Sequence, residues 1–352
     1  MLTKKNLPLL LIIVLFITSC SKELEFNTPP VNPSSVTVSL LAGSGTPGSV
    51  NGTGNAASFY QPTGVAVDAS GNVYVADFRN SLIREISQAG VVTTFAGGVN
   101  AGSANGTGIY ASFNEPTGVA TDGAGNIYVA DNGNNLIREI SPSGVVTTLA
   151  GTGAQGSANG PAAAASFNFP QGVAVDAAGN VYVADYGNNM IRKISAAGSV
   201  TTLAGRDSSG STNGVDTAAT FNQPSGVAVD AGGNVYVADF GNNLIRKISQ
   251  TGGVSTFAGS GTPGAANGTG AAASFNGPTG LAIDASGNVY VADYGNNLIR
   301  KITPAGVVTT IGNGAAGTGN TLFNGPYGVA VDAAGNIYVA NYRNSTIQKI
   351  SK

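Results

Sequence analysis

A short tag, Pro-x-Gly-(Val/Leu)-Ala, recurs six times along this chain and limits the folds that are open to it. The tag begins at Pro62, Pro116, Pro170, Pro224, Pro278 and Pro326, so four intervals of 54 residues are followed by one of 48. A fixed period of this length means that one supersecondary unit is repeated and that each unit buries its apolar side against its neighbours. The sequence therefore predicts an array of six similar units.

Each unit contains four short apolar runs of the kind that form strands. In the fourth unit they are residues 226–230 (GVAVD), 234–239 (NVYVAD), 244–249 (LIRKIS) and 253–259 (GVSTFAG). Short turns and links ending in glycine join the runs, which is typical of antiparallel meanders, and no window has the 3.6-residue period of a helix. The chain has 52 glycines, but its apolar residues gather in valine- and isoleucine-rich runs, so we expect a packed all-β fold and not disorder.

Four-stranded units repeated around an axis form a β-propeller, so six tags predict six four-stranded antiparallel blades. The chain ends after only three strands of the last blade. Residues 36–43 (VTVSLLAG) match a fourth strand and precede the first unit. We therefore expect residues 36–352 to form one propeller, closed by strand 36–43 completing the C-terminal blade, because closure hides edges that would otherwise aggregate.

Three motifs occur in nearly every unit: Pro-x-Gly-Val-Ala-Val-Asp, Gly-Asn-Val-Tyr-Val-Ala-Asp and Asn-x-x-Ile-Arg-Lys-Ile. With these motifs the chain after residue 35 resembles the NHL-repeat family. The resemblance implies a six-bladed propeller that usually serves as a binding platform for proteins, RNA or glycans. A minority of the family are enzymes, such as peptidyl-hydroxyglycine lyases, which bind zinc through histidines.

The N-terminus has the pattern of a lipoprotein leader. Two lysines precede an apolar run from Leu7 to Thr18, which is too short to span about 30 Å of hydrocarbon. The run ends in Ile17-Thr18-Ser19-Cys20, which resembles a bacterial lipobox. The resemblance implies that residues 1–19 are a signal peptide and that Cys20 is lipidated. The alternative is a buried structural cysteine, but the chain has no second cysteine with which Cys20 could pair.

Residues 20–35 are polar and proline-rich, so we expect a flexible tether behind the lipidated cysteine. Its Lys22-Glu23 and Glu25 resemble the acidic export signal of Bacteroidota lipoproteins. This resemblance implies an outer-membrane lipoprotein on the periplasmic or the cell-surface face, with the surface favoured. The chain would then contact the membrane through the lipid anchor only.

Residues that recur in every blade are expected to serve the fold. The turn aspartates can accept backbone N–H groups as Asx turns, and a calcium site is the alternative, although each turn offers too few oxygens for that ion. The strand-two aspartates and the repeated arginines are expected to pair within each blade, and the repeated phenylalanines to wedge between blades. The sets are Asp68, Asp122, Asp176, Asp230, Asp284 and Asp332; Asp77, Asp131, Asp185, Asp239 and Asp293; Arg84, Arg138, Arg192, Arg246 and Arg300; and Phe59, Phe113, Phe167, Phe221, Phe275 and Phe323.

Composition excludes several functions. The chain has no histidine, so a zinc lyase site, a Ser-His-Asp triad and a Cys-His pair are impossible. Without the two leader lysines, 14 basic residues face 18 acidic ones, which weighs against nucleic acid. Gly-x-Gly-x-x-Gly stretches occur, as at Gly43–Gly48, but no βαβ unit surrounds them, so no dinucleotide or other cofactor is expected. We expect a monomer.

Two classes of function remain. The favoured hypothesis is a lipid-anchored, non-catalytic binding or scaffold propeller that recognises a protein or glycan at the cell envelope. The alternative is a metal-dependent hydrolase, resembling gluconolactonases, with carboxylates converging in the central channel. Strand one reads Val-Ala-Val almost throughout, with Thr121 as the main departure, and this pattern disfavours the enzyme.

The loop-rich face carries the candidate site, because exposed loops on a rigid scaffold concentrate function. After strand two, blades 2–5 read Gly-Asn-Asn, but the first and last blades have Arg79 and Arg343 in place of the glycine. If the ring closes, these arginines are neighbours, and Phe78, Tyr327 and Tyr342 lie near them. This set would suit an anionic or sugar-like ligand. The alternative is that terminal repeats drift because they form the junction of the ring.

Overall fold

The structure is a computed structural model, and it describes residues 36–98, 100–311 and 322–351. The predicted signal peptide (1–19) and the tether (20–35), with the lipidation site Cys20, lie outside the described residues. Across those three ranges, no helix is long and apolar enough to cross a membrane.

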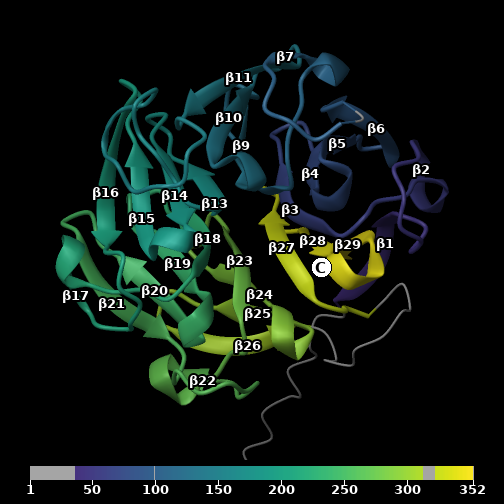
Figure 1. Cartoon of the computed structure of the whole chain (residues 1–352). Helices are drawn as coiled ribbons and strands as arrows, with labels where there is room; N and C mark the ends of the chain where they lie inside the picture. The colour runs from purple at the N-terminus through teal and green to yellow at the C-terminus, as the bar shows by residue number, and fades with distance from the viewer. Residues whose placement is uncertain (1–35, 99, 312–321, 352) are drawn as a thin grey trace, which may run out of the picture. The chain divides into compact units, whose positions relative to one another are not determined.

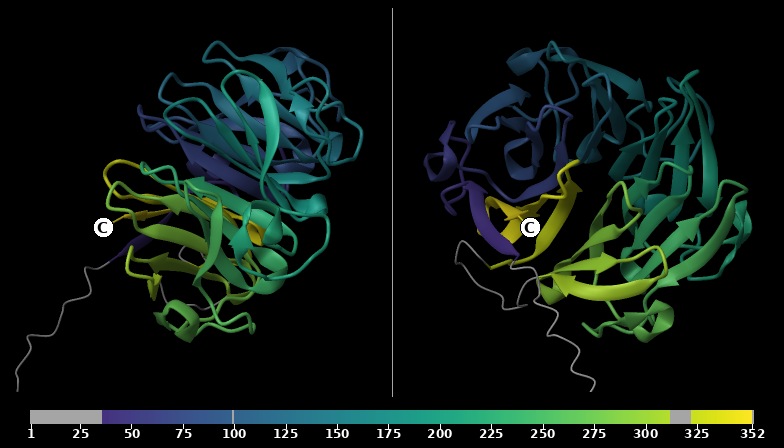
Figure 2. Two further views of the ribbon diagram at one scale, coloured as in Figure 1. Left: turned by 90° about the vertical axis from the view of Figure 1, so that its left-hand side faces the viewer. Right: turned by 180° about the vertical axis from the view of Figure 1, so that it is seen from behind.

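The described part of residues 36–351 folds into six antiparallel sheets around one axis, and we number these blades by the order of their tags (Figures 1 and 2). In each blade the strand that begins with the Pro-x-Gly tag is innermost, and later strands follow outward. Blade 1 has β3 (Pro62–Val67), β4 (Val73–Asp77), β5 (Leu82–Ile86) and β6 (Val91–Ala96); blade 2 has β8 (Pro116–Thr121), β9 (Ile127–Asp131), β10 (Leu136–Ile140) and β11 (Val145–Ala150); blade 3 has β13 (Pro170–Val175), β14 (Val181–Asp185), β15 (Met190–Ile194) and β16 (Ser199–Gly205). Blade 4 has β18 (Pro224–Val229), β19 (Val235–Asp239), β20 (Leu244–Ile248) and β21 (Gly253–Ala258); blade 5 has β23 (Pro278–Ile283), β24 (Val289–Asp293), β25 (Leu298–Ile302) and β26 (Val307–Ile311); blade 6 has β27 (Pro326–Val331), β28 (Ile337–Asn341), β29 (Thr346–Ser351) and β1 (Thr37–Ala42).

The six-bladed all-β prediction is confirmed, but five of the described sheets have five strands and not four. The additional strand has only two residues and pairs with the outermost long strand, as Gly52 does with Val92. It forms where the connection into a blade passes that blade's outer edge. These strands are β2 (Gly52–Thr53), β7 (Gly106–Thr107), β12 (Gly160–Pro161), β17 (Gly214–Val215) and β22 (Gly268–Thr269). A two-residue strand has too little pattern to be predicted from sequence.

Short 3-10 turns are the helical elements among the described residues. Six follow the second long strand of each blade: η2 (Phe78–Asn80), η4 (Asn132–Asn134), η5 (Tyr186–Asn188), η7 (Phe240–Asn242), η9 (Tyr294–Asn296) and η10 (Tyr342–Asn344). Four lie in the connections between blades: η1 (Gly54–Ala56), η3 (Gly108–Tyr110), η6 (Asp216–Ala218) and η8 (Gly270–Ala272).

The ring closes as the sequence predicted. Strand β1 pairs antiparallel with β29, with Thr37 opposite Ser351 and Leu40 opposite Gln348. Figure 1 shows β1, in purple, beside β29, in yellow. The N-terminal strand therefore completes blade 6 and covers an edge that would otherwise be unpaired. We call the junction between blades 6 and 1 the seam.

The innermost strands contact one another around the axis and leave little room for side chains there. The Thr63 hydroxyl in blade 1 donates to the carbonyl of Thr117 in blade 2 at 3.0 Å. A Cβ on Gly64 would lie 2.3 Å from that same carbonyl oxygen, so the glycine of the tag is needed for this approach. The tag is thus the sequence signature of the inner ring.

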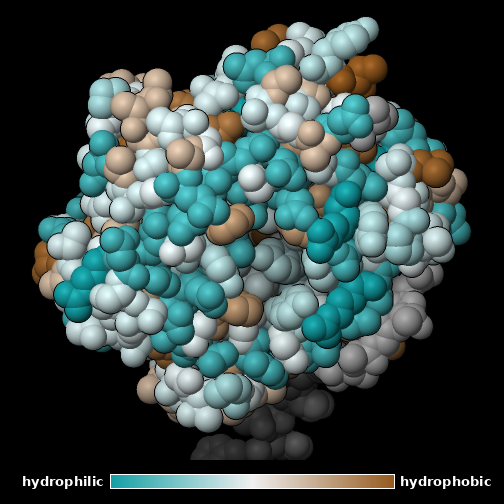
Figure 3. All heavy atoms as spheres, viewed as in Figure 1, coloured by the Kyte–Doolittle hydropathy of each residue, from teal (hydrophilic) through white to brown (hydrophobic). Residues whose placement is uncertain are grey.

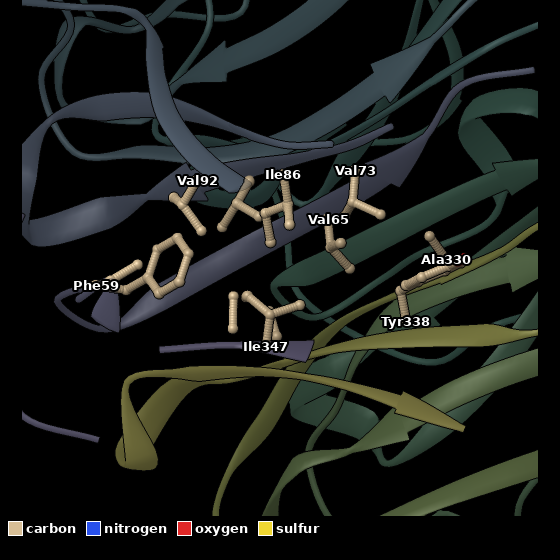
Figure 4. Packing of buried hydrophobic residues seen from close by; sticks show 12 residues of the cluster. Phe59, Val65, Val73, Ile86, Val92, Ala330, Tyr338 and Ile347 are labelled. Carbon is tan, nitrogen blue, oxygen red and sulfur yellow. The ribbon is translucent and has the colours of Figure 1, made fainter. Parts of the chain in front are cut away.

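The apolar core lies between neighbouring blades. At the seam, Phe59 is fully buried among residues of both blades, including Val65 of blade 1 and Ile347 and Tyr338 of blade 6 (Figure 4). The guanidinium carbon of Arg84 lies 5.3 Å from the centre of the Phe59 ring. The repeated phenylalanines are therefore wedges between blades, as expected, and not a ligand cage.

Each of blades 1–5 contains a fully buried ion pair. In blade 1, Arg84 Nη1 donates to Asp77 Oδ2 at 2.8 Å and to the carbonyl of Ser58 at 3.1 Å. The equivalent pairs are Arg138–Asp131, Arg192–Asp185, Arg246–Asp239 and Arg300–Asp293. Burial raises the pKa of the Asp77 carboxyl to about 6, and the bonds from Tyr60, Asn80 and Arg84 oppose that rise. Taking both charges out of water offsets much of their mutual attraction, so a buried pair of this kind is weak evidence for stability.

The turn aspartates act as Asx turns. Oδ1 of Asp122 accepts the backbone N–H groups of Ala124 (2.9 Å) and Asn126 (2.8 Å), and its Oδ2 accepts Asn126 Nδ2 and the Tyr128 hydroxyl. The bond from the backbone amide four residues later recurs at Asp68, Asp176, Asp230, Asp284 and Asp332. These carboxylate oxygens are therefore already occupied within their own turns.

Candidate functional site

The turns after the second long strand and the glycine-rich connections meet at one end of the propeller. In blade 1, Nδ2 of Asn80 donates to Asp77 Oδ2 and to the carbonyl of Gly48, both at 2.8 Å, while the amide of Tyr60 donates to Asp77 Oδ1 at 2.8 Å. The two asparagine bonds recur in blades 2 to 5. A buried carboxylate therefore ties both loops together, and this end, the loop-rich face, is rigid.

In five of the six blades, a half-buried aromatic side chain lies on this face, at the first position of the 3-10 turn that follows the second long strand. They are Phe78, Tyr186, Phe240, Tyr294 and Tyr342, and blade 2 has Asn132 instead. The space-filling view shows that the surface is hollowed at its centre, with strongly hydrophilic groups beside the hollow (Figure 3). We call these six residues, together with Arg79, Tyr327 and Arg343, the axial mouth.

Arg79 is held on three sides within the axial mouth. Its guanidinium carbon lies 5.0 Å from the centre of the Phe78 ring. Its Nε donates to Gln61 Oε1 at 3.2 Å, and its Nη1 lies 2.5 Å from Oε1 of Glu115 in blade 2. The Arg79 and Glu115 side chains keep 47% and 38% of their exposure, so the pair adds little stability.

Three tyrosines meet beside the seam. The ring centre of Tyr342 lies 5.8 Å from that of Tyr327 and 6.3 Å from that of Tyr294, and Tyr294 and Tyr327 are 6.0 Å apart. The Tyr342 hydroxyl donates to Gln61 Oε1 at 3.0 Å, across the seam. The guanidinium carbon of Arg343 lies 4.8 Å from the centre of the Tyr294 ring, and its Nη2 donates to the Tyr294 hydroxyl at 3.1 Å.

The structure thus brings the five residues singled out in the sequence into one chain of contacts. The Phe78 ring lies 6.5 Å from Tyr342, which links the blade 1 pair to the blade 6 tyrosines. Their proximity follows from ring closure. Their role in binding a ligand remains a prediction.

Tyr327 forms the floor of the axial mouth. From blade 6 its hydroxyl donates to Gln171 Oε1 in blade 3 at 2.8 Å, and the Ser225 hydroxyl of blade 4 donates to the same oxygen at 2.9 Å. Burial raises the pKa of the Tyr327 phenol, so it stays protonated and remains a donor at neutral pH. With glycines and valines of the inner strands, these residues line a cavity of about 60 Å³.

The residue before each tag proline has left-handed backbone in all six blades. Gly277 and Gly325 adopt this conformation without strain, but Gln61, Glu115, Phe169 and Gln223 have φ of 54°, 51°, 47° and 53°. Such a backbone costs about 1–2 kcal/mol for residues other than glycine. Glycine in two blades shows that the fold itself does not require a side chain at this position.

The sequence alone missed Gln61, Tyr294, Gln171 and Glu115. Tyr294 did not stand out in the sequence, because most blades have an aromatic residue at the equivalent position. Glu115 did give a signal, since it is one of three acidic residues in the propeller that belong to no repeated set. The pairing of Glu115 with Arg79 depends on the distance between blades, which no local pattern encodes.

The central channel, where the metal-dependent alternative would place its carboxylates, is lined mainly by apolar side chains. A wider space of about 210 Å³ is lined by six inner-strand segments of valine, alanine, leucine and isoleucine, with Thr121 as the polar exception. The Thr121 hydroxyl donates to the carbonyl of Val67 at 3.1 Å. Within the part of the chain that the structure describes, no group of three or more Cys, Asp or Glu side chains is arranged to hold a metal ion.

Six segments match the sequence profile of the NHL repeat. They are residues 59–86, 113–140, 167–194, 221–248, 275–302 and 323–350. The chain belongs to the NHL-repeat family. Each match begins at the wedge phenylalanine and ends in the third long strand, so the repeat unit contains the ion pair and the turn of the axial mouth.

Known proteins support the family and the fold. The protein SUPPRESSOR OF QUENCHING 1, chloroplastic, of Arabidopsis thaliana is 32% identical over 281 residues, which cover 74% of this chain and 27% of that protein. The chain thus spans about a quarter of this relative's length. An auxiliary nutrient binding protein from Bacteroides thetaiotaomicron has a TM-score of 0.67 at 15% identity, covering 90% of this chain and 76% of that chain. A gluconolactonase from Xanthomonas campestris has a TM-score of 0.62 at 12% identity, covering 90% of each.

Proposed function

We propose that this NHL-repeat propeller is a binding module that takes its ligand at the axial mouth without transforming it. One observation carries the proposal: residues that break the six-fold repetition gather at this mouth. Arg79, Arg343 and Tyr327 are among them. Drift of the two terminal repeats alone would not place Glu115 of blade 2, which belongs to no repeated set, against Arg79.

The ligand class that fits best is a glycan, although the sequence also allowed a protein. Recessed aromatic rings with amide, hydroxyl and guanidinium groups between them suit a rigid sugar ring, which offers an apolar face and a rim of hydroxyls. A protein partner needs about 800 Å² of matching surface on each side. The axial mouth is a small hollow, so it fits a short segment of a ligand better than the broad surface of a protein.

The proposed setting is the cell envelope, where a lipidated Cys20 would hold the propeller on the outer membrane, with the cell surface favoured. A binding role agrees with the Bacteroides thetaiotaomicron structure described as an auxiliary nutrient binding protein. Replacing Cys20 with alanine should leave the protein soluble or uncleaved. A Cys20→Ala protein that is still anchored through an acylated N-terminus would contradict this setting.

The binding proposal is tested on a glycan array, followed by calorimetric titration of the purified protein with each glycan retained. Tyr342→Ala and the double variant Arg79→Ala with Arg343→Ala should lose binding. The double variant should melt near the parent, because both arginine side chains are exposed. Tyr110→Ala is the matched control, because Tyr110 lies in η3 and is 81% exposed. If the two sets of mouth variants bind like the parent, the site is wrong. Turnover of a bound glycan or lactone would favour the hydrolase alternative.

A further inference from the structure

Blades 1 and 6 carry an arginine at the same position, but the two arginines have different partners. Arg79 reaches forward to the residue before the tag proline of the next blade, Glu115, at 2.5 Å. A carboxylate is therefore already placed on the Arg79 guanidinium. This internal pair shows that the position can hold a carboxylate beside an aromatic ring.

The equivalent neighbour of Arg343 is an amide. The residue before the tag proline of the next blade is Gln61, on the other side of the seam. Its Oε1 already accepts hydrogen bonds from Tyr342 (3.0 Å) and Arg79 (3.2 Å). Arg343 lies instead against Tyr294 and donates one bond to its hydroxyl. Among the described carboxylates, none forms an ion pair with Arg343.

We propose that Arg343 binds the carboxylate of an acidic sugar, a uronic acid residue, whose ring lies against Tyr294 or Tyr342. This inference rests on the proposed glycan-binding function and names the sugar class. A guanidinium offers five N–H donors and binds a carboxylate through two parallel bonds. Contact with the Tyr294 ring and hydroxyl fixes the plane of the guanidinium, which lowers the entropy lost when the ligand binds.

Titration calorimetry with trimers of galacturonate, glucuronate and mannuronate, each beside its methyl ester, tests the inference. The ester keeps the sugar ring and removes the charge. At least one acid should bind about tenfold or more tightly than its ester, as expected for charge-assisted hydrogen bonds. Arg343→Ala should remove this preference, so that the acid and its ester bind with nearly equal affinity. Arg206→Ala is the control, because Arg206 is an exposed arginine whose Nε donates to the nearby Ser208.

A variant of Glu115 tests whether Arg79 can bind an anion in the same way as Arg343. Glu115→Gln should release Arg79 and create a second anion-binding position, so that acidic trimers bind more tightly than they bind the parent. Both side chains are partly exposed, so the fold should tolerate this change.

The outcomes separate the inference from the proposed function. If trimers bind but no acid is preferred over its ester, or if Arg343→Ala weakens acid and ester alike, the inference is wrong and glycan binding stands. If neither these trimers nor any glycan on the array binds, the proposed function fails.

Discussion

The buried pair of Asp77 and Arg84 should be replaceable by the neutral pair that blade 6 uses. There, Asn341 and Gln348 occupy the two positions, and both donate to the carbonyl of Leu322, at 3.1 and 3.0 Å. The amide of Asn324 donates to Asn341 Oδ1 at 2.7 Å, as the amide of Tyr60 does to Asp77. The informative set of variants is therefore Asp77→Asn, Arg84→Gln and the double variant.

Each single variant leaves one buried charge without its counter-charge, which costs about 3–5 kcal/mol. The double variant removes both charges and copies an arrangement that already exists in this fold. It still loses the Arg84 Nη2 bonds to the carbonyl of Val50 (3.2 Å) and to Asn51 Oδ1 (2.7 Å), which glutamine is too short to reach. The carbonyl of Val50 keeps its bond from the Ser58 amide and Asn51 is exposed, so losing these two bonds should cost about 1–3 kcal/mol in all. Simple addition of the two single losses would instead give about 6–10 kcal/mol.

Urea unfolding at neutral pH, followed by circular dichroism, gives the free energy of unfolding of all four proteins. We expect the double variant to be more stable than either single variant. A double variant that loses the sum of the single losses would refute the equivalence with blade 6. Single variants that lose less than about 1 kcal/mol would refute the claim that burial makes the separate charges costly.

Three further predictions test the closure, the strained backbone and the turns. Deleting residues 36–43 should reduce the free energy of unfolding by more than the roughly 1 kcal/mol of a typical point mutation, and so lower the melting temperature, because blade 6 loses its outer strand. An unchanged melting curve would disprove closure by β1. Phe169→Gly should raise the free energy of unfolding by about 1 kcal/mol, since glycine adopts the left-handed backbone without strain, and a loss of stability in urea would mean that the side chain supports the fold. Burial acts to raise the pKa of Asp122, but hydrogen bonds from Asn126, Tyr128 and Ala124 hold it below its ordinary value of 3.8. This carboxyl therefore stabilises the fold above pH 3.8 and loses that contribution as the pH falls through the lowered value, so the melting-temperature gap between the parent and Asp122→Asn should narrow from about pH 5 to about pH 3; a widening gap would contradict the assignment.

The repeat made the fold predictable because local sequence and global architecture agree at every blade. The tag glycine sets the inner ring, as the contact between Gly64 and Thr117 shows, and the leading strand at residues 36–43 predicted where the ring closes. The two-residue strands were missed, since pairing such as that of Gly52 with Val92 depends on where a connection passes and not on its composition.

The candidate site was only partly predictable. Departures from the repeat located Arg79, Arg343 and Tyr327, because breaking a pattern is visible in sequence. The partners that give these residues their properties were not visible. Glu115 is 36 residues from Arg79, and Gln171 is 156 residues from Tyr327, so only the assembled ring brings them together.

Hydrogen exchange of the purified protein, with and without the glycan that binds most tightly on the array, tests the central claim that the axial mouth is the binding site. Bound glycan should slow amide exchange in residues 78–81, 325–327 and 342–345, and leave the Asx turn at residues 68–72 unchanged. Slower exchange confined to residues 68–72, or no change at the axial mouth while the glycan is bound, would contradict the claim.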